Sequence, residues 1–199
     1  SVNTMTVFCA CDGDHPGWWC AENDPLILSL SDSRYRMTDL SGGVEFDLGA
    51  KGVARQVPWT LGSSDEAFLA LDRNGNGVVD DGTELFGDVT PQHQTTHPNG
   101  FEALALHDDT LNGGNEDGRI DAADAIFGRL WLWTDRNHNG VSESRELEYL
   151  RDSEVEWISL AYRESDRVDR FGNEFRYQGR AGLAGGRTRV IWNVFLTAE

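Results

Sequence analysis

The residues of this chain with the clearest chemical potential lie between Asp135 and Glu146. Oxygen-bearing side chains occupy positions 1, 3, 5, 9 and 12 of this run, a glycine stands at position 6, and position 7 offers a backbone carbonyl. This is the pattern of an EF-hand loop, whose oxygens supply the six to eight ligands that Ca²⁺ prefers. It favours a calcium site over a solvated, acidic Asn/Gly turn. The predicted ligands are Asp135, Asn137, Asn139, Val141, Glu143 acting through water, and Glu146.

A second run begins at Asp72 and follows the same pattern through position 6, but it ends differently. Position 12 is Thr83, and a carboxylate comes one residue later, at Glu84. Closure of this loop therefore needs a different exit geometry or uses Asp80 or its acidic neighbour, and Gly82 would allow the backbone kink. We predict calcium here too, with the ligands Asp72, Asn74, Asn76, Val78, Asp80 and Glu84.

A third candidate surrounds Gly118, with Asp124 at position 12. Counting back places Gly113 at position 1, so Asp108 or Asp109 would have to complete a loop longer than twelve residues. The alternative is that the later acids only cap a following helix. We expect calcium rather than magnesium, which usually keeps several waters. The chain would then hold two to three Ca²⁺ ions, the third bound by Asp108, Asn115, Asp117, Arg119, Asp121 and Asp124.

Two further segments keep the outline of such a loop without its ligands. Residues 29–37 carry serines where acids would be needed, and the run from Asp47 has Gly52 at position 6 but Lys51 at position 5. We predict that neither segment binds metal. The ammonium group of Lys51, the single lysine of the chain, could pair with Asp47 in place of an ion, but a plain surface turn is favoured.

The charge of the chain is strongly acidic and unevenly distributed. Its 34 acidic and 17 basic residues give a net charge of −17, and residues 65–152, which contain all three candidate loops, carry 19 acidic and six basic residues, or −13. This charge argues against nucleic acid or anionic lipid as the main partner and favours cations. No apolar run predicts a membrane span, and the first residues lack a signal-peptide layout, so we expect a chain without membrane insertion.

Three cysteines, Cys9, Cys11 and Cys20, lie close together near the start of the sequence. In a secreted protein the favoured pairing joins Cys20 to Cys9 or Cys11 and leaves one thiol for another partner. A zinc site that adds His15 has suitable ligand chemistry but an unusual spacing, and unpaired thiols are the remaining alternative.

Apolar periodicity predicts strands towards both ends of the chain and short helices in the middle. Strands are expected at 26–31, 44–48 and 53–59 and in three segments after residue 156, and capping residues predict helices that begin near residues 65, 99, 121 and 142. The predicted fold class is α+β, with β-rich N- and C-terminal parts around short helices that flank EF-hand-like loops. Residues 1–23 would form a cysteine-containing extension, and residues 24–199 a single calcium-binding domain.

Several long motifs in a fixed order carry a family resemblance over about residues 24–195. The chain resembles the calcium-binding self-processing module of FrpC-like RTX proteins and related free-standing bacterial EF-hand-type proteins. The motifs are DPLIL, FLALDRNGNGVVDDGTELFGD, GFEALAL, DGRIDAADAIF, LWLWTDRNHNGVSESRELEYL and WISLAY. The resemblance implies calcium-triggered cleavage of an Asp-Pro bond, which here would be Asp24–Pro25.

The residues of this bond make such a cleavage chemically plausible. The Asp24 carboxylate can attack its own carbonyl carbon to form a cyclic anhydride, while the nitrogen of Pro25 leaves from a tertiary amide. Calcium would act by folding the chain so that the bond is held in an attack geometry. The two loops nearest this bond in sequence are, however, those without ligands, and the chain continues through it, which favours an uncleaved bond.

The sequence therefore favours a secreted or surface-exposed protein that calcium folds and stabilises in a structural or adhesive role. The alternatives are self-processing at Asp24–Pro25, and a subunit that binds other extracellular proteins through Trp18, Trp19 or the odd cysteine. Other enzyme classes are disfavoured because the G-x-S-x-G and H-E-x-x-H motifs are missing. A calmodulin-like sensor is disfavoured because the chain has only 2 Met and lacks paired long helices.

Overall fold

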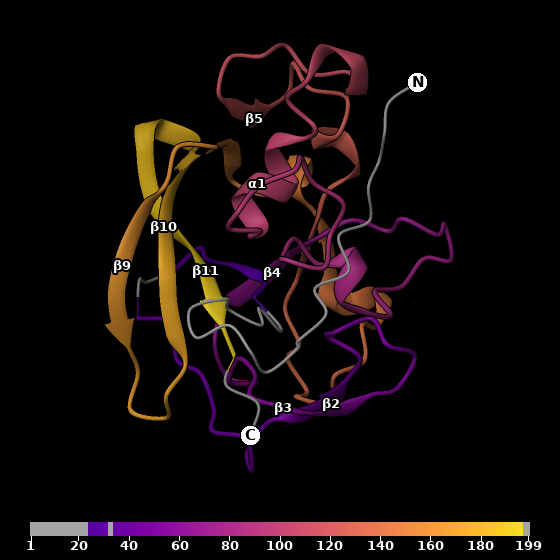
Figure 1. The fold of residues 1–199 in the computed structure, drawn as a ribbon, viewed down its shortest axis with the longest axis vertical. Helices are drawn as coiled ribbons and strands as arrows, with labels where there is room; N and C mark the ends of the chain where they lie inside the picture. The colour runs from indigo at the N-terminus through magenta and orange to yellow at the C-terminus, as the bar shows by residue number, and fades with distance from the viewer. Residues whose placement is uncertain (1–23, 32–33, 197–199) are drawn as a thin grey trace.

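The computed structural model describes residues 24–31 and 34–196, which fold around a curled antiparallel sheet (Figure 1). The sheet has nine strands in the order β5-β8-β10-β11-β1-β4-β6-β7, with β9 paired to β10, and β2 and β3 form a separate hairpin. The strands are β1 Leu26–Ser29, β2 Val44–Phe46, β3 Arg55–Val57, β4 Glu66–Ala70, β5 Arg119–Asp121, β6 Trp131–Trp133, β7 Leu147–Tyr149, β8 Val155–Ser159, β9 Arg163–Val168, β10 Glu174–Leu183 and β11 Arg187–Phe195.

Strand β1 lies at the centre of the sheet, between β11 and β4, where Ile27 is opposite both Trp192 and Phe68. Successive side chains of a strand point to opposite faces. Leu26 and Leu28 therefore enter one hydrophobic core, with the residues of helix α1 (Gly100–Ala105), while Ile27 enters a second core with the β2–β3 hairpin. A strand that is covered on both faces places the residues just before it, Asp24 and Pro25, in the interior.

The second core contains an aromatic cluster that supports one candidate loop. The ring of Trp59 lies 4.4 Å from that of Phe68 and 5.5 Å from that of Trp133, measured between centroids, and all three side chains are fully buried. Because Trp133 is the last residue of β6, the chain leaves this cluster directly into the loop that begins at Asp135. The start of that loop is thus fixed by a rigid part of the core.

The α+β class that the sequence predicts is wrong, because the described residues contain one α-helix, α1, and are otherwise β-structure and short turns. The predicted helix at 65–71 is strand β4, whose apolar run is buried on both faces and therefore lacks a strand-like alternation. The predicted helices after residues 121 and 142 are single 3₁₀ turns. The 3₁₀ turns are Gly82–Glu84, Thr110–Asn112, Phe127–Arg129, Ser144–Glu146, Leu150–Asp152 and Ala184–Gly186.

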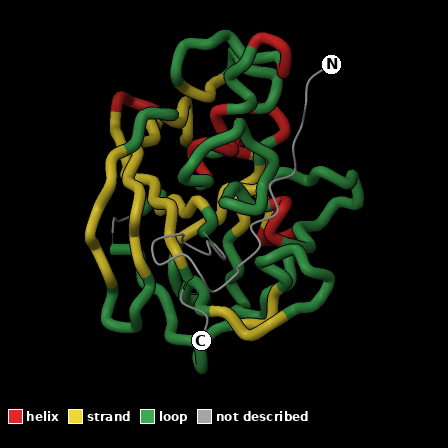
Figure 2. The backbone as a smooth tube through the Cα atoms, in the orientation of Figure 1, coloured by secondary structure: helices red, strands yellow, loops and turns green. Residues whose placement is uncertain are grey.

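The predicted helix start at Asn99 is confirmed. The side-chain oxygen of Asn99 accepts hydrogen bonds from the backbone N–H groups of Phe101 and Glu102, which is the bonding pattern of an N-cap. Figure 2 shows that loops make up most of the backbone around this helix, and Figure 1 shows β5 with its acidic loop at one end of the molecule and the β2–β3 hairpin at the other. No helix in the described residues has the length and apolar character needed to cross a membrane.

Candidate calcium loops and the Asp24–Pro25 junction

Three loops share one arrangement at their first acid. We name them loop A (72–84), loop B (108–124) and loop C (135–146). In each loop the first aspartate accepts a hydrogen bond from the backbone N–H of the glycine that follows the two oxygen-bearing positions. The pairs are Asp72 with Gly77 at 3.0 Å, Asp108 with Gly118 at 2.9 Å, and Asp135 with Gly140 at 2.8 Å.

The backbone of the three loops is also the same at two left-handed positions. The shared glycine has a φ of 85° in loop A, 84° in loop B and 70° in loop C, and the residue two places before it has a φ of 78°, 60° and 58°. Left-handed backbone is costly for residues other than glycine, so its repetition at equivalent places marks one loop conformation rather than three unrelated turns. The residues at the earlier position are Gly75, Glu116 and His138.

The acids that end loops A and C are equivalent although their sequence spacing differs. Oε1 of Glu146 accepts the backbone N–H of Arg136 at 3.0 Å, and Oε1 of Glu84 accepts that of Arg73 at 2.9 Å. Both glutamates are buried. The extra residue of loop A is accommodated at Gly82, where a Cβ atom would lie only 1.7 Å from the carbonyl oxygen of Leu48. Close backbone approach, rather than a left-handed turn, is therefore the reason for this glycine.

The first acid of loop B is Asp108 rather than Asp109. The carboxylate of Asp109 lies 2.8 Å from Nε2 of His93, whereas Asp108 receives the loop N–H groups. At the end of the loop Oδ2 of Asp124 accepts the N–H of Asp121 at 2.8 Å. Burial of the Asp124 carboxyl, followed by repulsion from the nearby acids, raises its pKa. Acidic groups thus gather at this loop from both of its ends.

The predicted middle ligands point into the loops through their side-chain oxygens or amides. In loop C the Nδ2 atoms of Asn137 and Asn139 donate to Oε1 of Glu143 at 3.0 and 3.1 Å. In loop A, Asn74 donates to Asp80 at 2.9 Å. In loop B, Asn115 donates to Asp117 at 3.2 Å. In loops A and C two asparagine side chains therefore converge on one acid, while Val78, Arg119 and Val141 can offer backbone carbonyls.

Loops B and C contain buried carboxylate oxygens that accept no hydrogen bond from an N–H group or a hydroxyl within the described residues: Oδ1 of Asp124, Oε2 of Glu143 and Oε2 of Glu146. A hydrogen bond with Glu146 lowers the pKa of Glu143 to about 2, while burial and then the contact with Glu143 raise the pKa of Glu146. Two carboxyl groups that share a proton can exchange it for a cation. No cluster of three or more His, Cys, Asp or Glu that could hold a metal occurs among the described residues, so amide and backbone oxygens would have to complete each site.

The loop at residues 47–52, which we name the remnant loop, has the same backbone shape. Oδ2 of Asp47 accepts the N–H of Gly52 at 2.6 Å, and Ala50 and Gly52 have φ values of 52° and 76°. Gly49 and Lys51 stand where loops A and C have oxygen ligands. The remnant loop therefore has the backbone conformation of loops A and C although it lacks their oxygen-bearing side chains at these two positions. The segment at 29–37 crosses residues outside the described part of the chain.

The Asp24–Pro25 junction lies in the interior, where four backbone or side-chain contacts fix it. Oδ1 of Asp24 accepts the backbone N–H of Asp88, and the carbonyl oxygen of Asp24 accepts Nδ2 of Asn193. The carbonyl oxygen of Pro25 accepts the N–H of Val194 at 3.1 Å, and the N–H of Leu26 donates to Phe86 at 2.9 Å. The bond that the resemblance singles out is thus held on both sides.

The Asp24 residue is 1% exposed, and Oδ2 accepts no hydrogen bond from an N–H group or a hydroxyl among the described residues. Burial raises the pKa of Asp24 well above its ordinary value, and repulsion from Asp88 raises it further. Gly87 allows this close packing, because a Cβ atom there would lie 2.9 Å from Oδ1 of Asp24 and 3.1 Å from its carbonyl oxygen. The junction therefore holds a carboxyl group that favours the protonated form.

The segment that contacts Asp24, residues 87–88, is held in place by hydrogen bonds from the residues that follow it. The hydroxyl of Thr90 accepts the N–H of Gly87 at 2.9 Å and donates to Leu85, and Nε2 of Gln92 donates to the Asp88 carbonyl at 3.1 Å. Oε1 of Gln92 in turn accepts the N–H of Asn99 at 3.0 Å. These bonds connect the Asp24 contact to the cap of α1.

Sequence reasoning missed both groups that contact the junction, Asp88 and Asn193. Asn193 is fully buried in strand β11, between Trp192 and Val194. A polar residue in the middle of an apolar strand was the available signal, because a buried amide needs hydrogen-bond partners. Asp88 closes the quoted motif TELFGD but resembles a surface acid in sequence.

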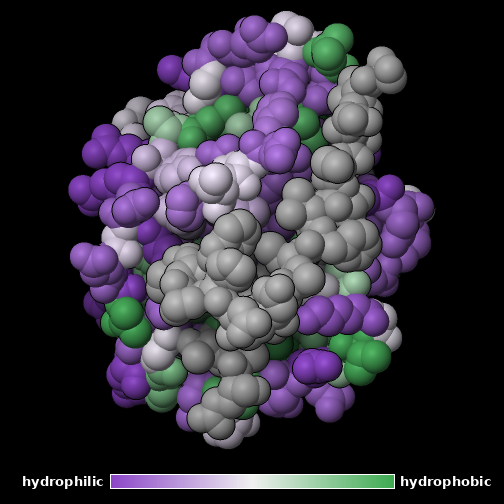
Figure 3. Space-filling view, viewed as in Figure 1, coloured by the Kyte–Doolittle hydropathy of each residue, from purple (hydrophilic) through white to green (hydrophobic). Residues whose placement is uncertain are grey.

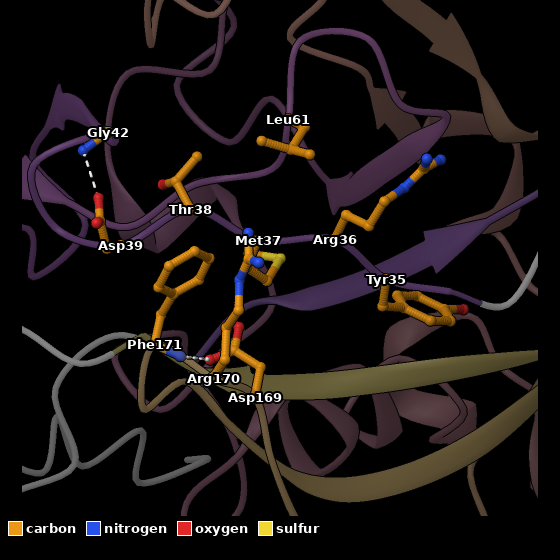
Figure 4. A pocket seen from close by; sticks show the side chains of 10 residues that line it. All are labelled: Tyr35, Arg36, Met37, Thr38, Asp39, Gly42, Leu61, Asp169, Arg170 and Phe171. Carbon is orange, nitrogen blue, oxygen red and sulfur yellow. Dashed lines mark hydrogen bonds between the residues drawn. The ribbon is translucent and has the colours of Figure 1, made fainter.

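A surface pocket of about 530 Å³ is a separate feature (Figure 4). It lies between the segment at 35–42 and the turn that joins β9 to β10, where Asp169 accepts the N–H of Phe171 at 2.8 Å. No predicted site residue lines it. The cysteine predictions for Cys9, Cys11 and Cys20, and the contact predictions for Trp18 and Trp19, fall outside the described residues.

Comparisons with known proteins support the family resemblance. The SPM domain matches residues 26–197. Over 179 residues the chain is 34% identical to the iron-regulated protein FrpA of Neisseria meningitidis serogroup C. The alignment covers 88% of this chain but 15% of that protein, so the chain spans a small part of its relative. The predicted relation to Frp-type bacterial proteins is confirmed, whereas calcium binding and processing stay predictions.

Proposed function

The chain belongs to the SPM-domain family, and from this premise we propose that it is a calcium-folded module that cleaves its own Asp24–Pro25 bond. In this proposal the module is part of a secreted or cell-surface bacterial protein, in keeping with its likeness to FrpA. The observation that carries the proposal is the arrangement of two groups around Asp24, each of which is joined to a candidate calcium loop.

The first connection starts from loop A. Its last acid, Glu84, is followed by Phe86, whose carbonyl oxygen accepts the N–H of Leu26, and then by Asp88, whose N–H donates to Asp24. A cation that draws the Glu84 carboxylate into loop A would therefore also fix the hydrogen bonds that Phe86 and Asp88 make with the junction. Glu84, which would bind the cation, and Asp88, which contacts Asp24, are only four residues apart in the sequence.

The second connection starts from loop B. Asp108 follows α1, and the first helical N–H, that of Gly100, donates at 3.4 Å to the side-chain oxygen of Asn193. The other side-chain atom of Asn193 then faces the Asp24 carbonyl. A cation that fixes the conformation of loop B would thus also stabilise α1, the helix that orients Asn193. Two loops therefore act on the same bond from two directions.

Calcium is the cation that these loops favour. They offer carboxylate, amide and carbonyl oxygens at EF-hand spacing, and magnesium would instead keep several waters. In Figure 3, hydrophilic side chains predominate at the end of the molecule that contains β5 and loop B, with a few apolar residues among them. Three Ca²⁺ ions would reduce the charge of residues 65–152 from −13 to about −7 and so relieve its self-repulsion.

A single incubation tests the proposal. The chain is purified in chelator, calcium is added, and intact mass is followed over hours. We expect two fragments that divide between Asp24 and Pro25, and no cleavage of Asp24→Asn under the same conditions. An intact wild-type chain after saturation with calcium would refute the processing activity.

A second candidate function is a purely structural or adhesive calcium-stabilised module. It is favoured by the remnant loop, in which Gly49 and Lys51 replace ligands close to the junction in sequence. In that case the mass stays constant while calcium raises the melting temperature. A subunit role with other extracellular proteins would add a change in size, measured by sedimentation with and without reductant.

A further inference from the structure

We propose that Asn193 and Asp88 are catalytic residues of the Asp24–Pro25 cleavage: Asn193 stabilises the oxyanion on the Asp24 carbonyl, and Asp88 exchanges the proton of the Asp24 carboxyl. The inference rests on the proposed processing activity and deepens it. It assigns the chemistry to two side chains that come from strand β11 and from the segment after loop A.

The position of Asn193 suits an oxyanion-stabilising role. Its Nδ2 atom donates to the carbonyl oxygen of Asp24, which is the atom that becomes negative when the carbonyl carbon is attacked. Its Oδ1 atom accepts the N–H of Gly100 at 3.4 Å, so the amide is oriented with its donor towards the bond. The side chain is fully buried, where water does not compete for the developing charge.

The neighbouring backbone preserves this orientation. The N–H of Val194 donates to the carbonyl oxygen of Pro25 at 3.1 Å, and Leu26 is opposite Asn193 in the β1–β11 pair. Residues on both sides of the bond are therefore fixed to strand β11. A carbonyl held in one orientation before the reaction loses little further freedom when it is attacked.

The position of Asp88 suits proton exchange with Asp24. Its backbone N–H donates to Oδ1 of Asp24, so the two residues are in direct contact, and burial followed by repulsion between their carboxyl groups raises the pKa of Asp24. Two neighbouring carboxyl groups do not both ionise readily in a buried site. The charge of Asp24 also contributes to the raised pKa of Tyr177 on β10, after burial and the charge of Glu164.

The reaction balances with these groups and one water molecule. With the shared proton on Asp88, the Asp24 carboxylate attacks its own carbonyl carbon, and the oxyanion is stabilised by Asn193. The C–N bond to Pro25 then breaks, its electron pair stays on the nitrogen, and that nitrogen takes the proton from Asp88. The products are a cyclic anhydride at Asp24 and a new amine at Pro25, and water then hydrolyses the anhydride to two carboxyl groups.

The test for Asn193 uses a matched buried asparagine as its control. Asn173 is equally buried, and its Nδ2 atom also donates to a backbone carbonyl, that of Thr38 at 3.0 Å. In the full chain with calcium, Asn193→Ala should slow cleavage by about 100-fold, as loss of an oxyanion donor does elsewhere. Asn173→Ala should lower the melting temperature to a similar degree with a cleavage rate within about threefold of wild type.

A second variant covers the case in which Asn193→Ala does not fold. At a pH where its carboxyl is ionised, Asn193→Asp keeps an oxygen that accepts the Gly100 N–H but has no donor for the Asp24 carbonyl. It should fold, as judged by near-ultraviolet circular dichroism, and cleave as slowly as the alanine variant. A folded Asn193→Asp chain that cleaves at the wild-type rate would overturn the role of Asn193.

The test for Asp88 is the pH profile of cleavage. Asp88→Asn keeps the backbone bond to Asp24 but cannot carry the proton, so it should lose about 100-fold in rate and flatten the pH dependence. Asp88→Glu should restore part of both. Asp169→Asn, which alters an acid in the β9–β10 turn, is the control and should leave the rate and the profile unchanged.

The outcomes separate this inference from the proposed function. If the wild type cleaves, Asp24→Asn does not, and Asn193→Asp and Asp88→Asn keep the wild-type rate and profile, then the processing activity stands and the two assignments fall. If the wild type does not cleave in saturating calcium, both the proposed function and the present assignments are refuted.

Discussion

Asp24 and Asp135 are equally buried, each with 1% of its surface exposed, yet their surroundings are opposite. Both oxygens of Asp135 accept hydrogen bonds, from the N–H groups of Asn139 and Gly140 and from the indole of Trp59. Asp24 receives one backbone N–H and faces a second carboxyl group. The number of donors around a buried acid, rather than its depth alone, therefore decides how strongly a negative charge there is stabilised.

The two surroundings correspond to two uses of a carboxyl group. At Asp135 the donors stabilise a negative charge that a cation can then meet, in a loop whose other ligands bend towards the same point. At Asp24 the environment favours the neutral acid and stores an unfavourable interaction next to a peptide bond. The same substitution, Asp to Asn, should therefore have opposite effects on stability at the two positions.

The largest expected effect is that of Asp135→Asn. The new amide would place a donor against the N–H of Gly140 and the indole N–H of Trp59, which leaves buried donors without an acceptor and costs about 1–3 kcal/mol for each of them. Calcium affinity of loop C should fall by about 100-fold because the first ligand and one charge are lost. Isothermal titration calorimetry and chemical denaturation would measure the two effects. The exposed Asp152→Asn is the control, and an unchanged calcium count with unchanged stability would contradict the comparison.

Asp24→Asn should act in the opposite direction. Because the pKa of Asp24 is raised in the folded state, the folded chain holds a proton that the unfolded chain releases above about pH 3.9. This contribution is fully present below that pH and is lost as the pH rises towards the folded pKa. Asparagine does not ionise, so the variant should be more stable than wild type by at least about 1 kcal/mol at pH 7 and about equal near pH 3.

Denaturation in chelator at the two pH values would measure this difference without cleavage. A variant that is less stable than wild type at pH 7 would show that the Asp24 site is built for a charged carboxylate. The comparison with Asp135 would then fail at its central point.

The sequence predicted local features of the chain better than the sheet that positions them. The N-cap at Asn99 is confirmed because it depends on adjacent residues, whereas the calcium ligands of loop C, which were also read from local spacing, stay predictions. Residues 66–70 were misread as a helix because a strand buried on both faces has no alternation, and only its pairing with β1 and β6 decides its structure. Asn193 and Asp88 could not be placed because they meet Asp24 across 169 and 64 residues of sequence.

Gly87→Ala is the next test, with an effect of about 1 kcal/mol. The added methyl group would lie 2.9 Å from Oδ1 of Asp24, so the carboxyl group must shift and cleavage should slow by about tenfold while calcium affinity stays unchanged. The control is Gly75→Ala in loop A, where a methyl group meets no atom within 4 Å but the φ of 78° disfavours alanine. Gly75→Ala should weaken calcium binding instead. If Gly87→Ala weakened calcium binding and Gly75→Ala left it unchanged, the separation of the junction from loop A would be contradicted.

The smallest expected effect concerns Asp47, which has loop N–H donors like Asp135 but is more exposed than either of the two buried aspartates. It is half exposed, and its loop has Gly49 and Lys51 at the ligand positions. The double variant Gly49→Asn and Lys51→Asn restores two oxygens but no closing acid, because position 12 is Pro58. Stability should change by less than about 0.5 kcal/mol, and the number of bound calcium ions in native mass spectrometry should stay the same. One additional ion would mean that a preformed loop with its first aspartate is sufficient, and that the closing carboxylates Glu84 and Glu146 are not what distinguishes a calcium loop from a turn.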